Sequence, residues 1–285
     1  MKKLMAIACF LAVLHVLHGR QDIHGKNAAL PSQNDEVCKR LPPSLWCTSE
    51  ALSKQCGYAD QCKKYKDSSY NKPVEITLLY ETLCPGCQKF IVDQLYPLSK
   101  NIPSEFVKIE LVPYGNAKTL ENGTIVCQHG EDECAYNKFE SCIISSIPEQ
   151  KEQISLVYCI EAQLKNKIDF DKATSKCFRT LSIGEDVQRL IQSCLVTRES
   201  TRLQEEAAAR TANVYPDKHD HVPWVLFNNA SLADAQLLLD DIPSLVCEWW
   251  RGDKQIPYCT VEKAYKTKMT EDRSCDGTIF KNKLQ

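Results

Sequence analysis

The chain has 285 residues, a formal net charge of −2 at pH 7 and sixteen cysteines. A net charge this close to zero, without a strong basic patch, argues against nucleic acid as a partner. The length allows one full-sized domain and a small module, and the cysteine content is typical of an oxidising compartment.

The amino-terminal end predicts a cleaved secretory signal peptide. Met1-Lys2-Lys3 gives a positive start, and a short apolar run from Leu4 to Leu17 precedes Gly19. That run is too short to span a membrane. We predict a signal peptide over residues 1–19 and a disordered polar leader over residues 20–36.

Two further features agree with the secretory pathway. Removal of Cys9 with the signal peptide leaves fifteen of the sixteen cysteines, so one thiol is expected to be free or to link two chains as a dimer. Asn122 and Asn229 each begin a sequon for N-glycosylation. We expect a glycoprotein that resides in an endosome or lysosome or outside the cell.

A compact cysteine cluster marks a small module over residues 37–66. Four cysteines in so short a segment predict two structural disulfides, whose pairing the sequence leaves open: Cys38, Cys47, Cys56 and Cys62. With Trp46 directly before a cysteine, the segment resembles the saposin A-type module. The resemblance implies a lipid or sorting partner, and the alternative is an uninvolved, disulfide-stapled extension. Residues 63–72 are expected to be a linker.

The main domain is expected over residues 73–250 and opens with a strand. Apolar and less apolar residues alternate from Val74 to Tyr80, and a helical stripe follows from Gln88 to Lys100. Pro97 should kink or end that helix. A second strand over residues 106–112 completes a right-handed parallel crossover.

Cys84-Pro85-Gly86-Cys87 lies where the first strand meets the helix. Free N–H groups and the partial positive charge of a helix start favour a thiolate at Cys84. Cys87 is one turn on, where it can attack a mixed disulfide formed at Cys84. A structural disulfide and half of a zinc site are the alternatives.

The second half of the domain returns to the sheet after a helical stretch, which we expect as an insertion over about residues 127–215. A strand at residues 222–227 is closed by the turn Asn228-Asn229. A last helix over residues 232–250 and a tail over 251–285, with Cys259 and Cys275, follow.

The order of these elements resembles the thioredoxin superfamily. The resemblance implies an α/β, thioredoxin-like fold with a helical insertion between the CxxC half and the cis-proline half. Pro223, preceded by Val222, holds the position of the proline that faces the CxxC in the cis form. The disulfide-rich module is an addition at the amino terminus.

A second motif begins at Cys127. It resembles the signature Cys-Gln-His-Gly-x2-Glu-Cys-x2-Asn-x4-Cys of the gamma-interferon-inducible lysosomal thiol reductase family. The matching positions are Cys127, Gln128, His129, Gly130, Glu133, Cys134, Asn137 and Cys142. The resemblance covers about residues 73–260. It implies an enzyme, a thiol-disulfide oxidoreductase that reduces disulfide-bonded protein substrates, commonly in an acidic lumen.

The residues of this signature also allow other roles. Cys127, His129 and Cys134 could be zinc ligands, but a clear fourth ligand is absent. We favour a disulfide-braced turn and no metal. His219 and His221 precede Val222-Pro223, so one imidazole could approach the thiols and favour a thiolate.

The chemistry makes one demand. An ordinary cysteine would be about one part in three thousand thiolate at pH 5, so Cys84 needs a strongly lowered pKa. We expect no cofactor, and an external thiol must restore the dithiol. The alternatives to a reductase are a non-enzymatic binding protein that uses the saposin-like module and a disulfide-braced immune or scaffold protein.

Overall fold

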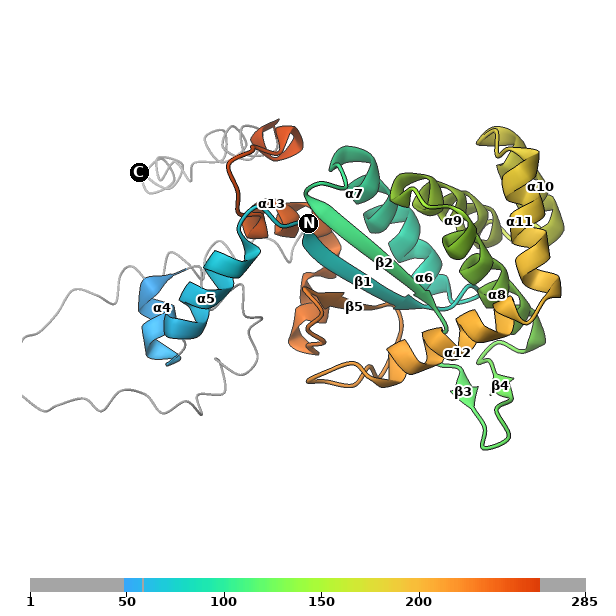
Figure 1. The fold of residues 1–285 in the computed structure, drawn as a ribbon, viewed down its shortest axis with the longest axis horizontal. Coiled ribbons are helices and arrows are strands. Elements are labelled where there is room, and N and C mark those ends of the chain that lie inside the picture. The colour runs from blue at the N-terminus through green and yellow to red at the C-terminus, as the bar shows by residue number, and fades with distance from the viewer. Residues whose placement is uncertain (1–48, 58, 262–285) are drawn as a thin grey trace, which may run out of the picture.

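The computed structural model describes residues 49–57 and 59–261 (Figure 1). The predicted signal peptide, the leader, Cys38, Cys47 and Cys275 lie outside the described residues. Among the helices of the described part, none is both long and apolar enough to cross a bilayer.

A three-stranded sheet forms the centre of the main domain, with the strand order β2-β1-β5. β1 (Val74–Tyr80) pairs in parallel with β2 (Val107–Pro113) and antiparallel with β5 (Trp224–Phe227). The expected parallel crossover and the expected return of the chain to the sheet are therefore both present. Asn228 and Asn229 adopt positive φ angles and close the turn after β5, as the sequence predicted.

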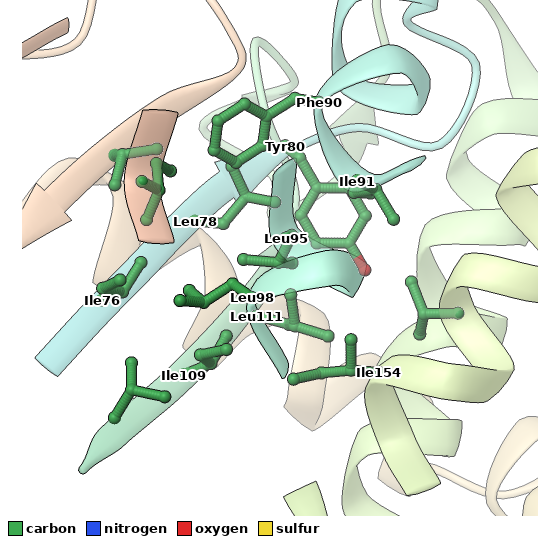
Figure 2. Packing of buried hydrophobic residues seen from close by; sticks show 14 of the residues in the cluster. Ile76, Leu78, Tyr80, Phe90, Ile91, Leu95, Leu98, Ile109, Leu111 and Ile154 are labelled. Carbon is green, nitrogen blue, oxygen red and sulfur yellow. The ribbon is translucent and has the colours of Figure 1, made fainter. Parts of the chain in front are cut away.

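Both faces of the sheet are covered, which explains why six of the seven residues of β1 are buried. Ile76, Leu78 and Tyr80 point to one face, as expected for the period of two in a strand, and pack under helices that include α9 (Figure 2). Leu79 belongs to a second cluster with Trp224 on the other face. The sheet is thus the middle layer of an α/β fold.

The helix after the CxxC is continuous but irregular. α6 (Pro85–Phe90) leads into a π-helical turn, η1 (Ile91–Leu95), and then into α7 (Tyr96–Asn101). Pro97 lies near the start of α7 and does not end the helix. The π-helical turn directly before it accommodates the hydrogen bond that proline cannot donate. In place of the predicted kink or end, the helix therefore contains a π turn.

Five helices separate β2 from β5 and form the predicted insertion. They are α8 (Glu131–Ser146), α9 (Gln150–Lys165), α10 (Phe170–Thr180), α11 (Glu185–Val196) and α12 (Glu199–Ala212). Asp169 caps α10, as expected, by accepting a hydrogen bond from the Lys172 N–H. In Figure 1, α8 to α11 gather beside one end of the sheet, and the short hairpin of β3 (Lys118–Thr119) and β4 (Ile125–Val126) projects below them.

The expected helix over residues 232–250 is two elements. A 3-10 helix, η2 (Asp234–Asp241), is followed by α13 (Ile242–Trp249). Asp241 accepts a hydrogen bond from the Ser244 N–H, and Pro243 lacks the N–H that a continuous helix would need, so a new helix begins here.

The domain extends further at both ends than its predicted boundaries. Ile256 and Cys259 of the expected tail are buried in the core, and Cys259 is disulfide-bonded to Cys247 of α13. Residues 63–72 are not a simple linker, because α5 (Ala59–Ser69) continues through most of them. The Tyr65 hydroxyl accepts a hydrogen bond from the Asn228 side chain, which attaches α5 to the turn after β5.

The predicted small module is only partly within the described residues. α4 (Glu50–Gln55) and α5 form a helical pair (Figure 1). Cys56 and Cys62 are both disulfide-bonded and buried, in agreement with a stapled module.

Candidate active site

The CxxC motif stands at the carboxyl end of β1, where the chain turns into α6. Cys84 is the N-cap residue of α6, and its sulfur accepts a hydrogen bond from the Cys87 N–H at 3.3 Å. Cys84 is partly exposed, Cys87 is buried, and both are free thiols. The arrangement presents one sulfur to solvent and keeps the second directly behind it.

The loop before β5 lies against this motif. β5 runs antiparallel to β1, so its first residues arrive beside the carboxyl end of β1. The Val222–Pro223 peptide bond is cis, and the Cys84 thiol points to the Val222 carbonyl oxygen at 3.7 Å. A Cβ added to Gly86 would meet the Pro223 ring at 3.3 Å, so the CxxC turn and the proline are in close contact.

The surroundings shift the pKa values of the two thiols in opposite directions. The pKa of Cys84 is lowered to about 6, first by a hydrogen bond from the Cys87 thiol, and then by the Cys87 and Gly86 amides and the charge of His129, against the opposing effect of burial. Burial, followed by the hydrogen bond and charge of Cys84, raises the pKa of Cys87 far above its usual range. Cys84 is therefore the thiol of the pair that ionises first, with about half of it present as thiolate at pH 6.

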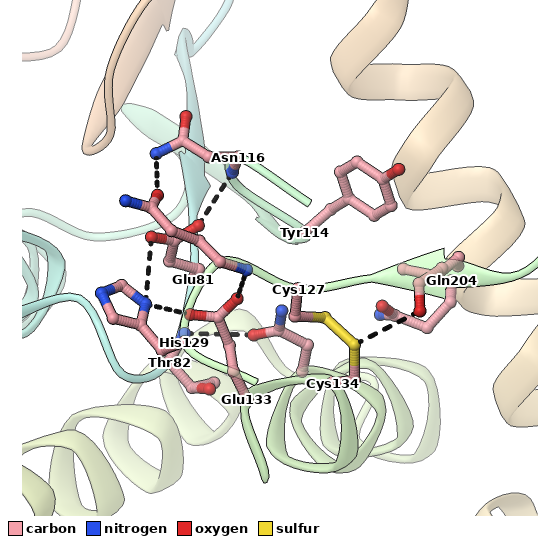
Figure 3. Close-up of a disulfide and its surroundings, with 12 residues drawn as sticks. Glu81, Thr82, Tyr114, Asn116, Cys127, His129, Glu133, Cys134 and Gln204 are labelled. Carbon is pink, nitrogen blue, oxygen red and sulfur yellow. Dashed lines mark hydrogen bonds and ion pairs between the residues drawn. A yellow bond between two sulfur atoms is a disulfide. The ribbon is translucent and has the colours of Figure 1, made fainter. Parts of the chain in front are cut away.

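Two buried carboxyl groups and an imidazole converge next to the motif (Figure 3), close enough for the charges of His129 and Glu81 to act on Cys84 and Cys87. His129 Nδ1 hydrogen-bonds to Glu133 Oε2 and lies 3.5 Å from Glu81 Oε1. Both carboxylates are almost completely buried, whereas the His129 side chain is 36% exposed. His129, which the sequence left without a firm role, thus faces the active site.

The remaining signature residues hold Glu81, His129 and Glu133 in position through hydrogen bonds and backbone conformation. The Gln128 N–H donates to Glu133 at 3.0 Å, and Asn137 accepts a hydrogen bond from the Thr82 N–H at 3.1 Å. Gly130 is the N-cap of α8 at a φ of 91°, a conformation that favours glycine. The contact between Asn137 and Thr82 attaches the start of the insertion to the loop between β1 and the CxxC.

Four disulfides brace the insertion and the carboxyl-terminal end. The pairs are Cys127–Cys134, Cys142–Cys194, Cys159–Cys177 and Cys247–Cys259. The first of them excludes Cys127 and Cys134 as zinc ligands in this state.

One group of side chains has the composition of a cation site. Single ligand atoms of Glu81, His129 and Glu133 all lie within 4.8 Å of one another. The same carboxylates already accept hydrogen bonds from the Asn116 and Gln128 amides and from His129, so their oxygens are engaged within the protein.

The two histidines before Val222 take other positions. His219 hydrogen-bonds to the Gly115 backbone, and burial lowers its pKa. His221 is exposed and pairs with Asp220 at 2.5 Å. The imidazole whose charge lowers the pKa of Cys84 is His129, so the structure gives it the part that the sequence suggested for His219 or His221.

Sequence reasoning missed three buried carboxyl groups. Glu81 follows β1 directly, and Glu140 and Glu161 lie under the CxxC helix, all with an exposed fraction of 1% or less. The Tyr80 hydroxyl donates to Glu140 at 2.5 Å. A signal was present, since Glu133, Asn137 and Glu140 recur at helical spacing on the face of α8 that meets the sheet.

Comparisons with known proteins agree with this geometry. The family model described as gamma interferon inducible lysosomal thiol reductase matches residues 75–181. A gamma-interferon-inducible lysosomal thiol reductase of Carassius auratus is 35% identical over 221 residues, which are 76% of this chain and 82% of that protein. The corresponding reductase of Mus musculus is 34% identical over 66% of this chain and 72% of its own length.

A plant protein and a bacterial structure are also similar to this chain. A gamma-interferon-responsive lysosomal thiol protein of Arabidopsis thaliana is 33% identical over 70% of this chain and 80% of its own length. The oxidoreductase DsbA of Xylella fastidiosa superposes with a TM-score of 0.37 at 12% identity, over 64% of this chain and 91% of that structure.

Proposed function

The chain belongs to the gamma interferon inducible lysosomal thiol reductase family, and on that premise we propose that it reduces disulfide bonds of protein substrates in an acidic endosomal or lysosomal lumen. Cys84 is the nucleophile and Cys87 the resolving thiol. The observation that carries the proposal is the partly exposed Cys84 sulfur, with a pKa of about 6, beside the cis Val222–Pro223 peptide. At pH 5 roughly a tenth of such a thiol is ionised, instead of about one part in three thousand.

The reaction proceeds in two exchanges. The Cys84 thiolate attacks one sulfur of the substrate disulfide, the substrate S–S bond breaks, and the released sulfur leaves as a thiolate that takes a proton from solvent. Cys87 then attacks the Cys84 sulfur of the mixed disulfide. The second substrate thiol is released, and the Cys84–Cys87 pair is left oxidised until an external thiol reduces it.

The surface around Cys84 supports a protein substrate. Pro85 and Gly86 are exposed, and Val222 and Pro223 are partly exposed beside them. We propose that an extended substrate segment lies over this surface, where the Cys84 sulfur can approach in line with a disulfide of the substrate.

We also propose Asn122, at the tip of the β3–β4 hairpin, and Asn229 as glycan sites, since both side chains are exposed. A mass shift on glycosidase treatment of protein from a eukaryotic host tests them.

The test is insulin reduction at pH 4.5–5.5 with an added thiol. Cys84→Ser is expected to remove turnover, because serine cannot form the mixed disulfide. Cys87→Ser is expected to trap substrate on Cys84 as a band that disappears when the gel sample is reduced. Lys89→Gln, an exposed change on the same helix, is the control and should retain full activity. Turnover by Cys84→Ser would refute the assignment.

A further inference from the structure

The two thiol exchanges leave one neighbouring cluster of side chains without a chemical step. It consists of Glu81, His129 and Glu133 (Figure 3). One ligand atom from each of these residues lies within 4.8 Å of the other two. Glu81 directly follows β1, and the other two come from the start of the insertion, so the fold brings them together. Two carboxyl groups and an imidazole are ligand types that bind divalent transition metals such as zinc.

The separations between the three side chains fit a small cation. His129 Nδ1 hydrogen-bonds to Glu133 Oε2 and lies 3.5 Å from Glu81 Oε1. A zinc ion with bonds of about 2.1 Å holds its ligand atoms about 3.4 Å apart in a tetrahedron. A cation that takes the place of the proton between His129 and Glu133 would therefore require only modest shifts of these side chains.

Each carboxyl group is held through one oxygen and directs the other at the imidazole. Glu81 Oε2 accepts a hydrogen bond from the Asn116 N–H at 2.8 Å. Glu133 Oε1 accepts one from the Gln128 N–H at 3.0 Å. The oxygens that remain, Glu81 Oε1 and Glu133 Oε2, both face His129 Nδ1. Outer hydrogen bonds of this kind orient the ligands of protein metal sites, and a bound cation would leave both amide bonds in place.

Burial and charge also favour a divalent cation between the two carboxyl groups. Their side chains are 1% and 0% exposed, whereas the His129 side chain is 36% exposed. Burial raises the pKa of Glu81 to about 7, against the Asn116 hydrogen bond, and the charge of Glu133 adds to the rise. A cation would offset the repulsion between two buried carboxylates. The partly exposed imidazole leaves an approach from solvent, so water can occupy the fourth position of a tetrahedral ion.

We propose that Glu81, His129 and Glu133 form a binding site for one zinc-like divalent cation, through Glu81 Oε1, His129 Nδ1 and Glu133 Oε2. Of the zinc ligands considered from the sequence, this site keeps His129 and has two carboxylates in place of the disulfide-bonded Cys127 and Cys134. A bound cation would join the segment after β1 to the start of α8. Its binding does not depend on the proposed reductase activity.

The decisive experiment titrates Zn²⁺ into the untagged, oxidised protein at pH 7 and measures binding by isothermal titration calorimetry. Oxidation closes the Cys84–Cys87 pair and iodoacetamide blocks any remaining thiol, because free thiolates would bind zinc themselves. The wild type should bind one ion per chain at this site. In His129→Gln the affinity should be at least about 100-fold lower, since even the loss of an outer hydrogen bond weakens metal binding by about 10- to 100-fold.

Matched variants separate loss of the site from loss of structure. His221→Gln, at an exposed histidine, and Glu131→Gln, at an exposed glutamate in the first turn of α8, should bind zinc as the wild type does. Glu133→Gln should weaken binding as His129→Gln does. If the buried change prevents folding, His129→Gln carries the test, because its side chain is partly exposed. Excess Zn²⁺ should also raise the melting temperature of the wild type and of both controls, but not that of His129→Gln.

Two results would overturn the proposal. One is a wild type that binds no zinc, and the other is an affinity in His129→Gln equal to that in His221→Gln. Equal affinities in a folded Glu133→Gln and in Glu131→Gln would remove the carboxylate from the ligand set and with it the site as proposed. None of these results bears on the loss of insulin reduction in Cys84→Ser, so the proposed function is tested separately.

Discussion

Two cysteines of the same motif differ in acidity because their surroundings differ. Cys84 is partly exposed at the start of α6 and receives several hydrogen bonds, whereas Cys87 lies in the core and faces a neighbouring anion. Both effects come from positions one helical turn apart. The division of labour between nucleophile and resolving thiol is thus set by a small displacement along one helix.

This contrast predicts how the two replacements of Cys87 differ. The Cys87 thiol is the first of the groups that lower the pKa of Cys84, so Cys87→Ala should shift the titration of Cys84 to higher pH. Cys87→Ser keeps a hydroxyl donor and should shift it less. Thiolate absorbance at 240 nm between pH 4 and 10 measures both curves. Coincident curves for the alanine and serine variants would show that the thiol donor has no such effect.

The parts of the site that depend on local sequence patterns could be predicted. Cys84, Cys87 and Pro223 could be assigned from the order of strand, motif and helix. The role of His129 could not, because the interaction that gives it a place joins it to Glu81, 48 positions earlier in the chain. Burial of Glu81 depends equally on the loop at Gly115, and charge patterns along the sequence do not report such packing.

At the scale of elements, α8 and α9 bring two acids together beneath the sheet. Glu140 and Glu161 are completely buried and lie within hydrogen-bonding reach of one another, beside the Tyr80 hydroxyl. Burial raises the pKa of Glu140 to about 7 and that of Glu161 well above its ordinary value. Two such groups cannot both ionise readily, so the packed arrangement retains a proton.

The pair predicts a protein that is more stable in acid than at neutral pH. Because the folded-state pKa of Glu140 lies above the unfolded value near 4.5, its contribution is complete below pH 4.5 and is lost as the pH rises to about 7. The free energy of unfolding should fall over this range by an amount on the order of 3 kcal/mol. Urea denaturation at a series of pH values measures it.

Glu140→Gln is the informative variant for this effect. Glutamine keeps an oxygen to accept the Tyr80 hydroxyl but carries no titrating proton, so the pH dependence should flatten. Glu152→Gln, an exposed change on α9, is the control and should keep the wild-type slope. A slope in Glu140→Gln equal to that of the control would mean that other groups cause it.

The helical boundaries show what periodicity can and cannot predict. Apolar spacing correctly indicated a continuous helical insertion between β2 and β5, because these faces bury against the sheet. The π turn before Pro97 and the break at Pro243 were not predicted in detail. Each is a local backbone conformation that accommodates a proline without an N–H donor. Several such conformations are possible, and packing against neighbouring elements determines which one forms.

At the scale of the whole molecule, covalent links hold the insertion together. Cys142–Cys194 joins α8 to α11 across 52 residues of sequence, whereas Cys127–Cys134 closes a turn across 7. A longer closed loop restricts the unfolded chain more strongly. The outer helices thus depend on the first bridge for their attachment, and the second acts mainly on local geometry beside His129.

Removing each bridge should therefore have a different effect on stability. Replacing Cys142 and Cys194 by alanine should lower the free energy of unfolding by about 4 kcal/mol, and replacing Cys127 and Cys134 by alanine should lower it by about 2.5 kcal/mol. Guanidinium denaturation of the two double variants under identical conditions compares them. Equal losses, or a larger loss for the short bridge, would contradict this order.

An enzyme that cleaves sulfur–sulfur bonds also meets copies of itself, and the insertion and carboxyl-terminal end of each copy carry four such bonds among the described residues. In every one of these bridges at least one cysteine is buried: Cys127, Cys142, Cys177, Cys194 and Cys259. Attack requires the incoming sulfur to line up with the bond it breaks, and covering side chains prevent that approach in a folded neighbour. Burial of these sulfurs should therefore protect a folded copy of the protein from reduction by its neighbours.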